Sequence, residues 1–120
     1  MRPNSSRISE NLSPREAHRL ISIHEEDLDF VIVDLRTPQE YARGKIKKAI
    51  NLDYHSPAFI DDLKKLNKEK TYLIYCLANV RSANALKLMG HLGFREVYNL
   101  LGGIRQWYHE GQPIVHNEKK

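Results

Sequence analysis

Short apolar runs alternate with helix patterns along most of the chain, and this alternation is the strongest constraint on its fold. Residues 30–35 (FVIVDL) form a continuous run rich in β-branched residues, which is typical of a strand buried on both faces of a parallel sheet. Residues 71–76 (TYLIYC) form a second buried run. Helix patterns with short connections separate such runs, so the sequence predicts an α/β fold around a parallel sheet.

The expected helices begin at recognisable capping signals. Ser13 and Thr37 each stand directly before a proline and three residues before a glutamate, which is the pattern of a capping box. We expect strands over residues 7–11, 30–35, 48–53, 71–76 and 96–103. We expect helices over residues 12–23, 37–44, 56–67, 81–93 and 104–111.

The length of 120 residues fits one domain, and a hydrophobic content of 41% suits a soluble globular chain. We expect that domain over residues 7–115, with flexible termini at 1–6 and 116–120. The longest apolar runs are too short to cross a bilayer, and residues 1–11 contain no apolar signal segment. A single cysteine cannot form an internal disulfide, which agrees with a reducing compartment. The expected protein is a cytoplasmic monomer that does not bind membranes.

The net charge of +4 comes from basic residues that are dispersed rather than gathered into one stripe. Dispersed charge predicts a solvated surface and argues against nucleic-acid binding, while the positive balance could still favour a small anionic substrate. The six histidines have no metal-ligand spacing. We therefore expect no metal site and no cofactor.

The only cysteine, Cys76, stands where a predicted strand ends and a helix pattern begins. In parallel sheets, ligands bind beyond the carboxyl ends of the strands. A tight loop over residues 76–81 would point its N–H groups inward, and the following helix would add the positive end of its dipole. Both features stabilise a thiolate, Arg81 adds a fixed charge, and Asn79 tolerates a left-handed conformation. The alternative is a buried structural thiol with Arg81 paired on the surface.

Three segments of the sequence resemble the rhodanese-like sulfurtransferase family over roughly residues 7–115. The segment VIVDLRTPQEYARGKIKKAINLD is similar to the family pattern V-D-x-R-x-x-x-E-[YF]-x-x-G-H-I-x-G-A-x-N. YLIYCLANVRSANA is similar to the active-site pattern C-x-x-G-x-R-S, and YNLLGGIRQWYHEGQPI is similar to the closing pattern L-x-G-G-x-x-x-W-x-x-x-G-x-P. Their common order and spacing make the resemblance specific.

The resemblance implies a three-layer fold, in which a five-stranded parallel sheet carries helices on both faces. It also implies that the thiolate of Cys76 attacks the outer sulfur of a donor, either a small anion such as thiosulfate or a protein that carries a persulfide. An external thiol or cyanide would then remove this sulfur, because the chain has no second cysteine. The substrate-binding residues that it implies are Leu77, Ala78, Asn79, Val80, Arg81 and Ser82.

Loop length separates this chemistry from that of the cysteine phosphatases. Those enzymes use the pattern C-x5-R, in which five residues between cysteine and arginine form a loop wide enough for a phosphate group. Here four residues lie between Cys76 and Arg81, so the expected cradle suits a single sulfur atom. A phosphatase or arsenate reductase remains a minor alternative. A non-catalytic protein-binding or regulatory module and a thiol-based redox sensor are further alternatives.

The sequence departs from the family pattern at three positions. Asn79 replaces the loop glycine, Lys45 replaces a histidine, and Lys48 replaces a second glycine. Arg81 is the only cation in the loop, which disfavours dianionic thiosulfate and leaves room for a persulfide donor.

Several polar and aromatic residues outside the loop receive structural interpretations. We expect Asp34 to tie down the chain at its strand end and Arg36 to pair with Glu40. His55 is expected on the surface. A tight strand-to-helix connection at residues 102–103 and a last helix anchored by Trp107 and Tyr108 complete the prediction.

Overall fold

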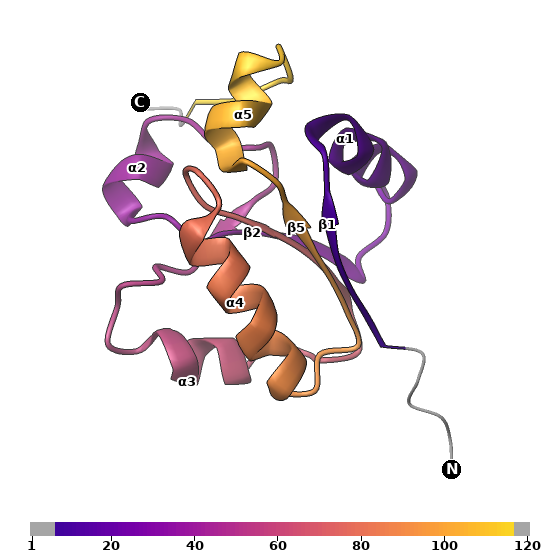
Figure 1. Ribbon diagram of the computed structural model, residues 1–120, viewed down its shortest axis with the longest axis vertical. Coiled ribbons are helices and arrows are strands. Elements are labelled where there is room, and N and C mark those ends of the chain that lie inside the picture. Colours follow the sequence, from indigo (N-terminus) through magenta and orange to yellow (C-terminus); the bar gives the residue numbers. More distant parts are fainter. Residues whose placement is uncertain (1–6, 117–120) are drawn as a thin grey trace.

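A five-stranded parallel sheet forms the centre of the computed structural model, which describes residues 7–116 (Figure 1). The strands are β1 (Ile8–Leu12), β2 (Phe30–Asp34), β3 (Ile50–Asn51), β4 (Thr71–Tyr75) and β5 (Glu96–Leu100). Their order is β1-β5-β4-β2-β3, and each neighbouring pair is parallel. The central strand β4 is buried at every residue, as its apolar run predicts. The predicted α/β fold is therefore confirmed.

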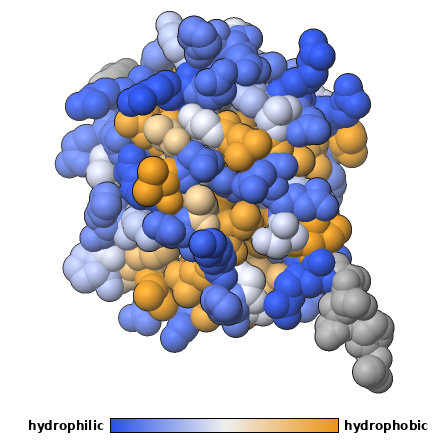
Figure 2. Space-filling view, viewed as in Figure 1, coloured by the Kyte–Doolittle hydropathy of each residue, from blue (hydrophilic) through white to orange (hydrophobic). Residues whose placement is uncertain are grey.

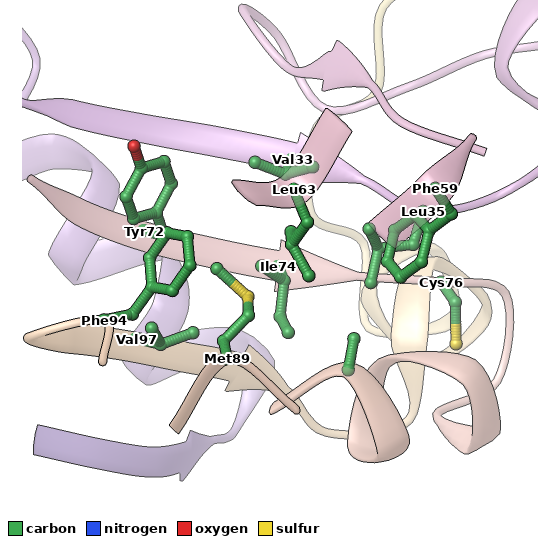
Figure 3. Close-up of a cluster of buried hydrophobic side chains, with 11 residues drawn as sticks. Val33, Leu35, Phe59, Leu63, Tyr72, Ile74, Cys76, Met89, Phe94 and Val97 are labelled. Atoms are coloured by element: carbon green, nitrogen blue, oxygen red, sulfur yellow. The ribbon is translucent and has the colours of Figure 1, made fainter. Parts of the chain in front are cut away.

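Helices cover both faces of this sheet. They are α1 (Pro14–Ile23), α2 (Pro38–Ala42), α3 (Phe59–Lys64), α4 (Val80–His91) and α5 (Gly103–His109). Side chains of α3 and α4 pack with Tyr72 and Ile74, whereas side chains of α1 and α5 pack with Leu73 and Tyr75. Because successive strand residues face opposite sides, β4 contributes to both cores, and so do its neighbours β2 and β5. Figure 3 shows the first of these clusters, with Cys76 at one end of it.

The two predicted capping boxes are present. Ser13 and Glu16 close one at the start of α1, and Thr37 and Glu40 close the other at the start of α2. The element boundaries are less well predicted. The helix expected from residue 56 begins at Phe59, and the strand expected over 48–53 is limited to Ile50–Asn51.

The prediction for the last helix is half correct. Trp107 is buried, and its indole Nε1 donates to the carbonyl of Pro113 at 2.8 Å. Tyr108 does not anchor the helix, because this residue is 70% exposed. Adjacent residues of a helix point in different directions, so only one of the two can face the sheet.

The surface view shows mainly hydrophilic residues with separate hydrophobic patches between them (Figure 2). None of the helices within residues 7–116 is long and apolar enough to cross a membrane. The tails predicted at residues 1–6 and 116–120 lie outside the described residues, except for His116. His116 is described, and its Nδ1 lies 3.1 Å from the carbonyl oxygen of Arg43.

Candidate active site

The loop after β4 lies at the carboxyl end of the sheet, between α2 and α5 (Figure 1). Cys76 is the first residue after the strand, and α4 begins at Val80, one residue earlier than predicted. The strand order places β5 and β2 on either side of β4. The cysteine therefore lies at the centre of the edge where parallel sheets bind their ligands.

The sulfur of Cys76 accepts hydrogen bonds from the backbone at the start of α4. The N–H of Asn79 lies 3.2 Å from Sγ, and the N–H of Ser82 lies 3.3 Å from it. The hydroxyl of Ser82 is a third neighbour, at 3.4 Å. Backbone N–H groups at a helix start favour an anion, so this arrangement stabilises negative charge on the sulfur.

Asn79 adopts the left-handed conformation that the sequence predicts, with φ 104° and ψ −26°. Its carbonyl accepts from the Ser82 hydroxyl at 3.3 Å. Its side-chain Oδ1 accepts from Nδ2 of Asn99, a fully buried residue of β5, at 3.0 Å. Asn79 is therefore held at its N–H, its carbonyl and its side chain.

The first turn of α5 supports the other side of the loop. The N–H groups of Ile104 and Arg105 donate to the carbonyls of Cys76 and Leu77 at 2.9 and 3.0 Å. Gly103 makes this approach possible, because a Cβ atom there would lie 2.3 Å from the Leu77 carbonyl oxygen. Gly102 and Gly103 have φ values of 77° and 65°, which confirms the predicted tight connection. The sequence interpretation missed that this connection also holds the loop.

Arg81 turns its guanidinium toward α2. Its Nη1 donates to Oε1 of Glu40 at 3.0 Å, and its Nη2 lies 3.4 Å from Oε2. The hydrogen bond from Arg81 lowers the pKa of Glu40 to about 2, so this carboxylate is ionised at neutral pH. The same bond raises the pKa of Arg81. The two side chains form a partly buried ion pair at the edge of the loop.

The predicted pairing of Arg36 with Glu40 is wrong. The Arg36 guanidinium bonds instead to the carboxylate of Asp34 at 2.7 to 3.1 Å and to the Gly44 carbonyl at 2.6 Å. Residues two apart in an extended segment face the same side, which brings Asp34 and Arg36 together. Asp34 also accepts from the N–H of Arg36 at 2.9 Å, so its predicted role in tying down the strand end is confirmed.

A family model described as the rhodanese-like domain matches residues 13–110, most of the chain. The chain belongs to the rhodanese-like domain family. A sulfurtransferase from Allochromatium vinosum is 36% identical over 107 residues, which cover 89% of this chain and 91% of that protein. A tRNA uridine(34) hydroxylase from Teredinibacter turnerae is 32% identical, and the match covers 82% of this chain but only 31% of that protein.

The solved structures agree with this family assignment. A crystal structure of a rhodanese-related protein from Thermoplasma volcanium superposes with a TM-score of 0.77 at 26% identity. The superposition covers 90% of this chain and 99% of that one. The three-layer fold that the sequence resemblance implies is therefore confirmed.

The structure distributes the predicted site residues between the sulfur and its surroundings. Asn79 and Ser82 contact the sulfur of Cys76, and Arg81 reaches Glu40 instead. The remaining predicted loop residues expose their side chains fully or in part: Leu77, Ala78 and Val80. His55 is exposed, as predicted. Sequence reasoning did not place Glu40 or Asn99 at this site, and the E-[YF] pair of the first motif was the only signal for Glu40.

Proposed function

We propose that this chain is a sulfurtransferase that carries sulfane sulfur as a persulfide on Cys76. One observation carries the proposal: the sulfur atom of Cys76 accepts hydrogen bonds from two backbone N–H groups at the start of α4. This geometry favours a thiolate, the form of cysteine that acts as a nucleophile. Cys76 is also the only thiol in the chain, so the persulfide has a single candidate position.

The proposed reaction has two half-reactions. In each of them, the transferred sulfur atom forms a bond to a new partner as its bond to the previous partner breaks. The Cys76 thiolate attacks the outer sulfur of the donor, a new S–S bond forms, and the old S–S bond breaks. The electron pair of the broken bond leaves with sulfite from thiosulfate or with a thiolate from an alkyl persulfide. Cyanide or an external thiol then takes the outer sulfur and restores the thiolate, so no separate oxidant or reductant is needed.

The comparisons support sulfur transfer more than the activity of the longer relatives. The sulfurtransferase relative matches over nearly its full length, whereas the chain spans about a third of the tRNA uridine(34) hydroxylase relatives. Most of the sequence of those longer proteins lies outside the match, so the hydroxylase activity in their name is not assigned to the matched segment. The shared part is the segment that contains Cys76.

Steady-state kinetics with thiosulfate or an alkyl persulfide as donor and cyanide as acceptor test this function. A persulfide intermediate predicts ping-pong kinetics, with parallel double-reciprocal lines as the cyanide concentration changes. The Cys76→Ala variant should form no thiocyanate above the uncatalysed rate. Absence of turnover in the natural chain with both donors would favour the non-catalytic binding module. Faster reaction of Cys76 with peroxide than with either donor would favour the redox sensor.

A further inference from the structure

The ion pair between Glu40 and Arg81 bears on which sulfur donor the loop accepts. Arg81 is the only basic residue from Cys76 to Ser82, so it is the only charge of the loop that can attract an anion. Its guanidinium is bonded to both carboxylate oxygens of Glu40. The side chains of Arg81 and Glu40 are 17% and 22% exposed, so water screens the pair only in part. The net charge that the pair presents to an incoming donor is zero.

Glu40 is itself fixed by the start of α2. Its Oε1 accepts from the N–H of Thr37 at 2.9 Å, and the Thr37 hydroxyl lies 3.3 Å from the same oxygen. The capping box thus holds the carboxylate at the position where Arg81 meets it. Moving Arg81 toward a substrate would leave a partly buried carboxylate without its partner, which is unfavourable.

The arginines on neighbouring elements are either paired or surrounded by water. Arg36 is buried and bonded to the carboxylate of Asp34. Arg105 lies in the first turn of α5 next to the loop, but it is exposed to water, which screens its charge. The loop itself presents apolar side chains, including Val80, which is 73% exposed.

We propose that Glu40 selects the donor by neutralising Arg81, so that the loop takes an alkyl persulfide in preference to thiosulfate. Thiosulfate brings two negative charges toward a thiolate, and a free cation would be needed to offset their repulsion. An alkyl persulfide brings at most one charge and an apolar carbon next to the sulfur, which suits Leu77, Ala78 and Val80. Cys76 forms the same persulfide from either donor, and the thiolate of the alkyl donor is the leaving group. This inference rests on the proposed sulfur transfer and names its donor.

Glu40→Gln tests the inference because glutamine keeps an oxygen for the N–H of Thr37 while removing the charge. We expect the rate constant for sulfur loading from thiosulfate to rise about fivefold to tenfold, and this gain to shrink at high salt. Loading from 2-hydroxyethyl persulfide should change less than about twofold, since the alkyl group of that donor is uncharged and only its persulfide can ionise. Serum albumin carrying a persulfide serves as the protein-borne donor. Faster loading from albumin than from 2-hydroxyethyl persulfide would assign the alkyl group to a partner protein, and the reverse to a small thiol.

Glu16→Gln is the matched control. Glu16 closes the same type of capping box at the start of α1, where it accepts from the N–H of Ser13 at 2.8 Å. This variant should load sulfur from both donors at the rate of the natural chain. Equal gains with thiosulfate in both variants, or a gain for both donors in Glu40→Gln, would overturn the selection by charge. A natural chain that loads faster from thiosulfate than from the persulfides would overturn it too.

Alkylation of Cys76 separates this inference from the proposed function. Iodoacetate and iodoacetamide are similar in size but differ by one negative charge, and their rate ratio needs no turnover. The ratio of iodoacetate to iodoacetamide should rise about threefold to tenfold in Glu40→Gln. It should fall in Arg81→Gln, where the charge of Glu40 is left unpaired. If no donor loads sulfur on the natural chain, the sulfurtransferase proposal fails. If the ratio of iodoacetate to iodoacetamide rates is the same in Glu40→Gln as in the natural chain, the role of Glu40 is contradicted, whether or not sulfur is loaded.

Discussion

The buried amide of Asn99 donates to the side chain of Asn79, and this contact joins strand β5 to the loop that holds Cys76. Nδ2 of Asn99 lies 3.0 Å from Oδ1 of Asn79 and 3.0 Å from Oδ1 of Asn11 on β1. Within the described residues, Oδ1 of Asn99 is buried without a hydrogen-bond partner. An unsatisfied buried oxygen is unfavourable, so the position of this amide is best explained by the loop that it holds.

Asn99→Ala should slow sulfur loading of Cys76 about threefold to tenfold, because one hydrogen bond that orients the Asn79 N–H is lost. Intact mass against time measures this rate. In an Asn79→Gly background the same substitution should have no further effect on the rate, since glycine has no side chain for Asn99 to hold. An equal slowing in both backgrounds would show that Asn99 acts through general stability instead.

Gly103→Ala should destabilise the fold by about 2 kcal/mol or more, because its Cβ would collide with the backbone of the loop at Cys76 and Leu77. Urea unfolding followed by circular dichroism measures this change. Gly90→Ala is the control, since Gly90 lies inside α4 and a Cβ there meets no atom within 4 Å. That variant should be neutral or more stable by about 0.5–1 kcal/mol. Equal effects at the two glycines would contradict the close packing of α5 on the loop.

The ion pair of Glu40 and Arg81 should make stability depend on pH. The pKa of Glu40 is about 2 in the folded chain and 4.5 ordinarily, so the folded state binds this proton less readily than the unfolded state. The stabilisation by the ion pair is then complete above pH 4.5 and is lost as the pH falls toward about 2. The stability difference between the natural chain and Glu40→Gln in urea should therefore shrink across this range. A difference that stays constant would contradict the pair.

Asp34→Asn should destabilise the chain by about 3–5 kcal/mol, because it leaves the buried guanidinium of Arg36 without its carboxylate. Thermal unfolding at neutral pH measures the loss. Asp61→Asn provides a comparison in the first turn of α3, where a carboxylate contributes little more than a favourable interaction with the helix dipole. Similar small losses in both variants would show that Asp34 and Arg36 are not coupled as the structure places them.

The sequence predicted the parallel α/β sheet and the strand-to-helix position of Cys76 because these depend on local signals, whereas the three layers were implied by the family resemblance. The β-branched run over residues 30–35, the capping boxes and the left-handed Asn79 each report the conformation of a few neighbouring residues. The partner of Arg81 could not be read in the same way, since Glu40 lies 41 residues away in the chain. The contacts of Asn99 and Gly103 with the loop depend on the neighbouring strand β5 and on α5, and tertiary packing alone brings them there.

The mass of the chain after incubation with a sulfur donor tests the central claim most directly. The reduced protein is treated with thiosulfate or an alkyl persulfide, and its intact mass is read before and after cyanide. We predict a gain of one sulfur atom per chain that maps to the peptide of Cys76, is absent in Cys76→Ala, and is released by cyanide as an equal amount of thiocyanate. A chain that gains no sulfur from either donor, or gains it equally in Cys76→Ala, would contradict the account.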